Sequence, residues 1–162
     1  MTGGNESHGH YFHDFVVGAE YRPTPRTIAE ADVVAYAALS GDTNPVHTDA
    51  AIAARMPFGE RIAHGLLGLA VSGGLLSSLG LIEGTSILLG VEWSFKAPIR
   101  FGDTVAAAIR VASTRLLSDG SRGIVEFEFD ISNQRSELVQ TGRHVFLIYT
   151  DAESMLPPTS AR

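Results

Sequence analysis

The chain has 162 residues and a formal net charge of −6, with 12 Lys and Arg against 18 Asp and Glu. This length predicts a single domain, and the acidic balance argues against broad nucleic-acid binding, which needs a concentrated positive surface. There is no cysteine, which excludes disulfides and thiolate chemistry and agrees with a reducing compartment. The first ten residues lack the apolar stretch of a secretory signal. We therefore expect a cytoplasmic protein.

Both ends of the chain have the composition of flexible tails. We expect tails at residues 1–10 and 151–162 around a single domain at residues 11–150. His8, His10, His13 and Asp14 could in principle chelate a metal, but a histidine-rich end is more often flexible than a metal site. We therefore predict no metal.

The first half of the domain is predicted to contain a short strand near Phe15 and then small helices. Thr27 and Glu30 have the spacing of a capping box, which predicts a helix over residues 28–40. Gly41 can end that helix in the left-handed conformation. The next four residues, 42–45, read as a rigid turn because Pro45 restricts the residue before it. A second short helix is expected from residue 49 or 50 to just before Pro57.

Residues 65–82 carry no charge and form the longest apolar stretch of the chain. The stretch is long enough to be weighed as a membrane span. Glycine and serine interrupt it repeatedly, and its flanks carry no basic cluster or aromatic belt. We therefore expect no membrane span, but a long buried helix from Gly65 to about Leu81.

After this helix the hydrophobic period changes to two, which predicts strands. Apolar residues alternate with polar ones around residues 91–96, 105–111 and 125–131, and residues 139–149 close the series. Asp119-Gly120 and residues 133–136 supply turns between them. An antiparallel sheet of about five strands should pack one face on the long helix, an α+β arrangement, because neither partner can bury its apolar surface alone. Trp93, Phe95 and Phe101 are expected in that core.

The densest group of polar residues lies between Ser40 and Asp49, followed by His64 and Gly65 at the start of the long helix. Asp42 and His47 can converge if the chain bends at Asn44-Pro45, and together they could remove a proton from one water. Free amides at the helix start could bind a developing oxyanion. The alternative is purely structural: Gly41 as a helix stop, Asp42 as a turn former and Asp49 as an N-cap.

The run Leu39-Ser40-Gly41-Asp42-x-Asn44-Pro45-x-His47, with His64-Gly65 after it, resembles the signature of the MaoC-like (R)-specific enoyl-CoA hydratases of the hot-dog superfamily. Residues 11–18, 57–59 and 93–102 also look like single-domain members. The resemblance covers most of the chain. It implies a hot-dog fold, an antiparallel sheet wrapped around a long central helix. It also implies reversible hydration of a trans-2-enoyl-CoA to a (3R)-hydroxyacyl-CoA, with no cofactor beyond the coenzyme A thioester substrate.

The resemblance implies a role for each motif residue. Asp42 and His47 would position and activate the water, and Gly65 would supply an amide to the thioester oxygen. The resting protonation state is a property of the coupled Asp42–His47 pair and is not assigned to either residue alone. Asn44 is expected to orient Asp42 or the turn. Further candidates for substrate binding or support are His64, Ser72, Arg61 and Lys96. Ser72 could line the acyl pocket or bond a neighbouring carbonyl, and the two cations could meet coenzyme A phosphates, as could Arg55, Arg100 and Arg143.

Two other functions stay open at this point. One is a hot-dog thioesterase, disfavoured because residues 65–82 contain no Asp or Glu. The other is a non-catalytic acyl-CoA-binding module. A homodimer or higher homo-oligomer is expected, joined at sheet edges or by helix packing, because a lone small sheet leaves exposed edges. The acyl chain length, the choice between coenzyme A and acyl-carrier protein, and the pathway do not follow from the motif.

Overall fold

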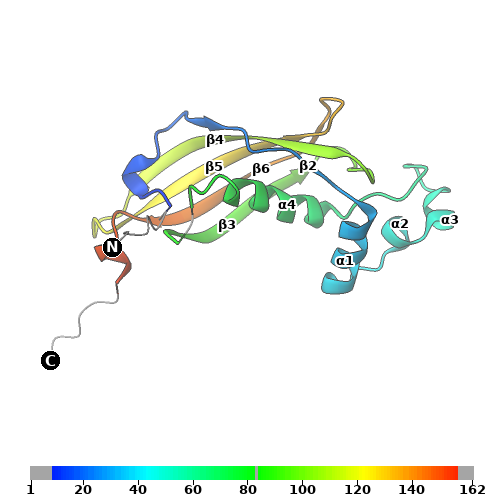
Figure 1. Ribbon diagram of the computed structural model, residues 1–162, viewed down its shortest axis with the longest axis horizontal. Coiled ribbons are helices and arrows are strands. Elements are labelled where there is room, and N and C mark those ends of the chain that lie inside the picture. Colours follow the sequence, from blue (N-terminus) through cyan, green and yellow to red (C-terminus); the bar gives the residue numbers. More distant parts are fainter. Residues whose placement is uncertain (1–8, 83, 157–162) are drawn as a thin grey trace, which may run out of the picture.

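The structure is a computed structural model that describes residues 9–82 and 84–156. Within them six strands form one antiparallel sheet in the order β1-β4-β5-β6-β3, with the short β2 also paired to β4 (Figure 1). The strands are β1 (Glu20–Tyr21), β2 (Arg26–Thr27), β3 (Ser86–Phe95), β4 (Thr104–Leu116), β5 (Arg122–Ser132) and β6 (Leu138–Tyr149). The four long strands and both predicted hairpins are confirmed.

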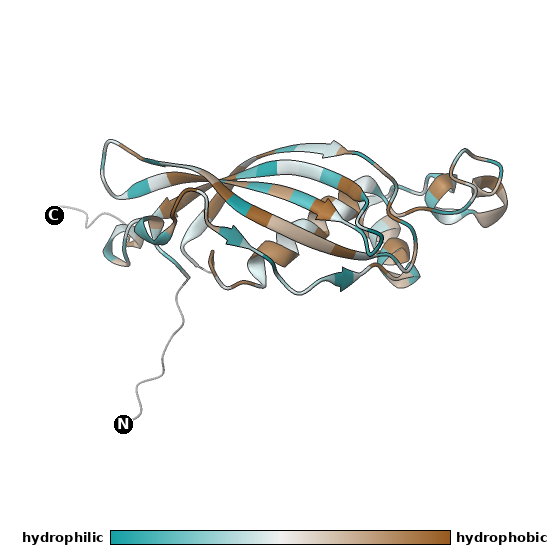
Figure 2. Cartoon of the chain, turned by 90° about the horizontal axis from the view of Figure 1, so that it is seen from above, coloured by the Kyte–Doolittle hydropathy of each residue, from teal (hydrophilic) through white to brown (hydrophobic). Residues whose placement is uncertain are grey.

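The helices fall into two groups. The longest is α4 (Gly65–Ser77), which runs along one face of the sheet, while a lobe of three smaller helices projects beyond one end of it (Figures 1 and 2). These three are α1 (Glu30–Ser40), α2 (Pro45–Thr48) and α3 (Ala50–Ala53); single 3-10 turns occur at Phe12–Asp14 and Glu153–Met155. In the described part of the chain, no helix is long and apolar enough to cross a membrane.

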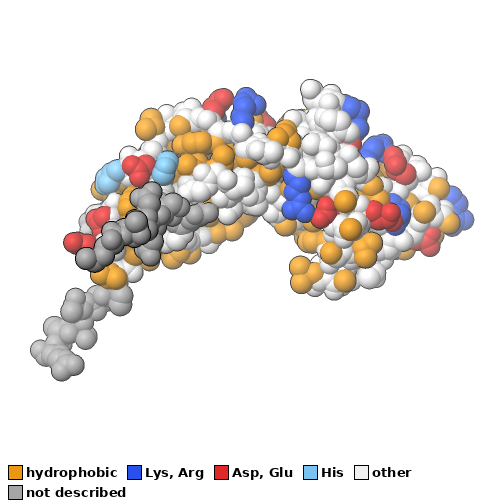
Figure 3. Space-filling view, viewed as in Figure 1, with side chains coloured by type: hydrophobic (Ala, Val, Ile, Leu, Met, Phe, Trp, Pro, Cys, Tyr) orange, Lys and Arg blue, Asp and Glu red, His pale blue; other side chains and the backbone are white. Residues whose placement is uncertain are grey.

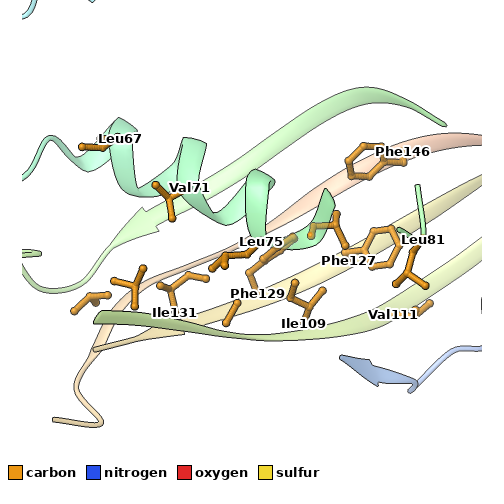
Figure 4. Packing of buried hydrophobic residues seen from close by; sticks show 14 of the residues in the cluster. Leu67, Val71, Leu75, Leu81, Ile109, Val111, Phe127, Phe129, Ile131 and Phe146 are labelled. Carbon is orange, nitrogen blue, oxygen red and sulfur yellow. The ribbon is translucent and has the colours of Figure 1, made fainter. Parts of the chain in front are cut away.

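The core lies between α4 and the sheet. Leu67, Val71 and Leu75 recur at every fourth position of α4 and face buried residues of β4, β5 and β6 (Figure 4). Along β5 the buried side chains alternate with partly exposed acidic ones, and the same alternation in hydropathy is visible along the strands (Figure 2). The buried core helix and the α+β arrangement are confirmed.

Several local predictions are wrong, each because a tertiary contact outweighs a local signal. The segment near Phe15 is a 3-10 turn, since Phe12 and Phe15 bury their rings against the sheet. Thr27 does not cap α1: it pairs in β2, and the carboxylate of Asp32 accepts the N–H of Ala29 instead. Finally, α4 ends at Ser77, four residues before the predicted Leu81.

Strand β3 also departs from expectation. The alternation predicts that its apolar residues face the core. Instead, Val91 and Phe95 are 42% and 53% exposed. About half of the surface of Ile87, Leu88 and Leu89 is exposed as well. Trp93 packs partly against the core. The reason is position: β3 is the last strand of the sheet and pairs with β6 alone, so nothing in the described chain covers its outer edge.

The predicted tails fall partly outside the described residues, which exclude 1–8 and 157–162, and with them His8. His10 lies against the domain, where its N–H donates to the carbonyl of Leu81 and its carbonyl accepts from Thr85 Oγ1. At the other end, Asp151 caps the last 3-10 turn through the N–H of Ser154. Hydrophobic side chains are also exposed on the helical lobe, where Val34 and Leu39 of α1 lie at the surface (Figure 3).

Candidate active site

Asp42 is held in a short loop between α1 and α2. Gly41 ends α1 with φ of +76° and donates its N–H to the carbonyl of Ala37, which turns the chain sharply. The backbone N–H of Asn44 then donates to Oδ1 of Asp42 (3.2 Å), and the side chain of Asn44 caps α2 through the N–H of Val46. Pro45 occupies the first position of α2. The loop therefore orients the carboxylate of Asp42 with local bonds alone.

His47 lies on α2 with one ring nitrogen already engaged. Its Nδ1 is 2.8 Å from the backbone carbonyl oxygen of Ile62. Because a carbonyl oxygen only accepts, Nδ1 must carry the hydrogen of the neutral ring. The opposite nitrogen, Nε2, is left with a free lone pair. His47 is thus in the tautomer that a general base requires.

His64, immediately before α4, is 2% exposed and bridges to the Asp42 loop. Its Nε2 donates to the backbone carbonyl oxygen of Asp42 (2.9 Å), so its Nδ1 is the unprotonated nitrogen. That Nδ1 is buried without a hydrogen-bond partner among the described residues. The ring also stacks on that of His47, with centroids 3.8 Å apart. His64 therefore connects the helix start to the backbone of the Asp42 loop and to the ring of His47.

Gly65 opens α4 with backbone donors that no described residue uses. No side chain caps the helix at His64, and the amides of Gly65 and Leu66 have no partner among the described residues. A helix N-terminus with free amides is a site for negative charge. At Gly65 a side chain would also press on Phe95, since a Cβ there would lie 2.9 Å from Cε1 of that ring.

These residues meet at one cavity. It has a volume of about 460 Å³ and is lined by Asp42, His47, His64 and Gly65 together with mostly apolar side chains, among them Phe58, Ile62, Leu66, Phe95 and Ile99. One ligand atom each of Asp42, His47 and His64 lies within 4.8 Å of the others. A single water with two hydrogen bonds of about 2.8 Å spans such a gap. The site can hold one water beside free amides and an apolar wall.

The same three side chains are the one group in the described chain that could ligate a metal. One nitrogen of each imidazole is already committed to a backbone carbonyl. The ring nitrogens without such a bond are Nε2 of His47 and the buried Nδ1 of His64. The expectation of no metal stays a prediction.

The remaining predicted residues divide between the cavity and other places. Lys96 lines the cavity, but Ser72 is 1% exposed and donates to the carbonyl of Leu69 (2.7 Å), away from the cavity lining. Arg61 pairs with Glu30, and its guanidinium lies over the ring of Phe101. The other cationic candidates are also engaged: Arg100 with Glu60 and Arg143 with Glu92. Arg55 is exposed and outside the cavity lining.

Sequence reasoning missed three groups at this site. They are the carbonyl of Ile62, the ring of Phe95 and the side chain of Gln140, which lines the cavity from β6. A backbone carbonyl leaves no trace in a sequence. Gln140 carried no distinct signal, since it lies among other polar residues at the start of the last predicted strand.

Comparisons with known proteins agree on one family. Residues 14–128 match the family model described as "MaoC like domain". A 3-hydroxybutyryl-CoA dehydratase of Methylorubrum extorquens is 38% identical over 63% of this chain and 64% of its own length. An (R)-specific enoyl-CoA hydratase of Aeromonas caviae is 42% identical over 61% of this chain and 72% of its own. The chain thus spans less than two thirds of the first of these relatives.

A solved structure matches over nearly its whole length. It is described as a monoamine oxidase regulatory protein from Archaeoglobus fulgius and superposes with a TM-score of 0.82 at 31% identity, covering 88% of this chain and 96% of that one. The hot-dog fold implied by the sequence motif is confirmed. The matched family region includes Asp42, His47, His64 and Gly65.

Proposed function

This chain belongs to the MaoC-like domain family, and on that premise we propose that it catalyses reversible addition of water to a trans-2-enoyl-CoA, giving a (3R)-hydroxyacyl-CoA. The observation that carries the proposal is one juxtaposition. The carboxylate of Asp42 and a ring nitrogen of His47 lie within 4.8 Å of each other, close enough to share one water, in a cavity that Gly65 also lines. The names of the relatives from Methylorubrum extorquens and Aeromonas caviae support it.

The reaction follows from the donors and acceptors present. Asp42 and His47 hold the water, and the pair takes one of its protons as the oxygen attacks the β-carbon. Electron density moves through the conjugated system to the thioester oxygen, which becomes negative. The N–H of Gly65 donates to that oxygen, and one such donor contributes about 10²–10³-fold to the rate. The pair then returns the proton to the α-carbon, which completes the addition with no cofactor.

The substrate's coenzyme A phosphates need a cation at the cavity. Lys96 lines the cavity, is exposed and has no ion pair with any described residue, whereas Arg61, Arg100 and Arg143 are each paired with a glutamate. We assign the phosphate contact to Lys96 for this reason. A local positive charge has to attract the phosphates, because the chain as a whole is acidic.

A homodimer through the free edge of β3 belongs to the same proposal. The exposed apolar residues of β3 would be covered if two copies paired edge to edge. Leu66 and Phe95, which line the cavity, are 57% and 53% exposed, and Phe95 belongs to β3. Such pairing would therefore also cover Phe95 at the cavity wall. Cytoplasmic location remains a prediction from the sequence.

Crotonyl-CoA tests the function directly. The enoyl absorbance should fall without release of free thiol, and chiral analysis should give (3R)-hydroxybutyryl-CoA. Thiol release equal to substrate loss would instead indicate a thioesterase, which the lack of Asp and Glu in α4 disfavours. A (3S) product would contradict the inferred facial arrangement. No turnover of short, long or branched enoyl-CoAs would favour a non-catalytic acyl-CoA-binding module.

A further inference from the structure

The first turn of α4 is held by a side chain from the far end of the chain. Gln140 of β6 is 2% exposed, and its Nε2 donates to the backbone carbonyl oxygen of Gly65 (3.0 Å). Its Oε1 accepts from the indole Nε1 of Trp93 in β3 (3.0 Å). One amide group therefore connects two strands of the sheet to the start of the helix.

The start of α4 needs an anchor of this kind because no side chain caps it. A capping side chain would accept hydrogen bonds from the first amides of the helix and so occupy them. The proposed reaction requires the amide of Gly65 to stay free for the substrate. Gln140 binds the turn at its carbonyl side, which leaves the amides of Gly65 and Leu66 open.

Two glycines shape the space around this amide. A Cβ on Gly68, one turn along α4, would lie 2.4 Å from Nε2 of Gln140. A Cβ on Gly142 would lie 2.3 Å from Cε3 of Trp93, so the indole packs directly on the backbone of β6. Both distances are shorter than a real Cβ contact, so a side chain at either glycine would force its neighbour to shift. The backbone is thus fitted to the Gln140 amide and to its indole partner.

We propose that Gln140 is a positioning residue: its bond to the carbonyl of Gly65 holds the first turn of α4, and that turn sets the direction in which the N–H of Gly65 points. The inference rests on the proposed function, in which that amide donates to the thioester oxygen. Charge on this oxygen develops in the transition state, so a misdirected amide should lower kcat more than it raises KM. A side chain that only filled space would affect stability and leave this split unchanged.

Gln140→Glu separates the hydrogen bond from the packing. Glutamate keeps the shape and the acceptor for Trp93, but its ionised form has no hydrogen to donate to Gly65. We expect kcat to be about tenfold below wild type at alkaline pH, with KM within about threefold. As the pH is lowered and the new carboxyl group protonates, it can donate again. The ratio of variant to wild-type kcat should then rise.

Gly68→Ala tests the same contact without changing Gln140. The added methyl must displace the amide, while alanine is a better helix former than glycine. A loss of kcat of about tenfold is expected here too. Trp93→Phe is the control: it loses the indole bond and some packing but leaves the bond from Gln140 to Gly65 in place. Its unfolding temperature should fall while kcat stays within about threefold of wild type.

The outcomes distinguish this inference from the function on which it rests. A wild-type protein without hydratase activity overturns the proposed function, and the role of Gln140 with it. An active wild type with unchanged kcat in Gln140→Glu, or with a loss that is independent of pH, overturns the role of Gln140 alone. If Gln140→Glu does not fold, Gly68→Ala decides: wild-type kcat overturns the inference and a tenfold loss supports it.

Discussion

The imidazole of His64 stacks on that of His47, with ring centroids 3.8 Å apart and planes inclined by 32°. The same ring donates through Nε2 to the backbone carbonyl of Asp42, and Tyr36 packs near it at 4.9 Å. His64 immediately precedes Gly65. One buried side chain therefore links the Asp42 loop and the ring of His47 to the start of α4.

Loss of the His64 ring should therefore impair turnover more than binding. We expect His64→Leu to lower kcat by about 10- to 100-fold, because it removes both the donor to Asp42 and the stacking on His47. His64→Gln keeps an N–H near the position of Nε2 and should recover part of the loss. Steady-state kinetics with crotonyl-CoA measure both, and equal activity of the Leu variant and wild type would rule out the linking role.

The proposed base pair predicts a larger effect. Asp42→Asn or His47→Gln should reduce turnover by at least ~10²-fold, since each removes a proton-transfer partner with little change in volume. Circular dichroism should be unchanged, because Asp42 is exposed and His47 only partly buried. Asp49→Asn is a matched control: Asp49 caps α3 through Ala51 and Ile52, and asparagine caps equally well. Wild-type turnover in Asp42→Asn or His47→Gln would refute the assignment.

Gly65→Ala should obstruct the cavity without unfolding the protein. The new methyl would meet the ring of Phe95 at 2.9 Å, and a side-chain ring can shift more readily than backbone. We expect kcat/KM to fall by about tenfold or more, because the methyl occupies space beside the amide that the substrate needs. Gly73→Ala is the control within α4, since no atom lies within 4 Å of a Cβ there. Equal kinetics for the two variants would contradict a substrate site at Gly65.

The free edge of β3 predicts the oligomeric state. Wild type should sediment as a dimer at micromolar concentration, and Leu89→Lys with Val91→Lys should yield monomers, because like charges then oppose each other across the two-fold axis. Leu39→Lys, on α1 at 86% exposure, should remain a dimer. A stable wild-type monomer, or a dimer unaffected by the β3 lysines, would place the interface elsewhere or remove it.

His144 predicts a pH dependence of stability. It is buried among Trp93, Phe129 and Phe146, and this burial lowers its pKa to about 4. Between pH 6.5 and 4 the unfolded chain therefore binds a proton that the folded chain does not. The free energy of unfolding should fall as the pH drops through this window, by roughly 3 kcal/mol in total from this group.

His144→Leu isolates that contribution. Leucine does not titrate, so the variant should lose less stability than wild type between pH 7 and 4.5. Urea unfolding at a series of pH values measures the difference. Identical pH dependence in the two proteins would show that the pKa of His144 is the same in the folded and unfolded states.

Local sequence determined most of the elements and half of the candidate site. Gly41 and Asp49 mark helix ends because capping acts over a few residues, and the structure has the end of α1 and the start of α3 there. The short helix α2, which begins at Pro45 at the end of the predicted turn, is not among the predicted elements. The strands followed from their alternation. Asp42 and His47 lie close enough in sequence for one bend to bring them together.

Tertiary structure alone decided the rest of the site. His64 meets Asp42 across 22 residues and Gln140 meets Gly65 across 75, and both contacts depend on where the lobe and β6 lie relative to α4. The exposure of Phe95 likewise follows from the position of β3 at the edge of the sheet. Hydrophobic patterning states which side of a strand is apolar. Strand order and register determine whether another element covers that apolar side. Both arise from packing between segments that are far apart in the chain.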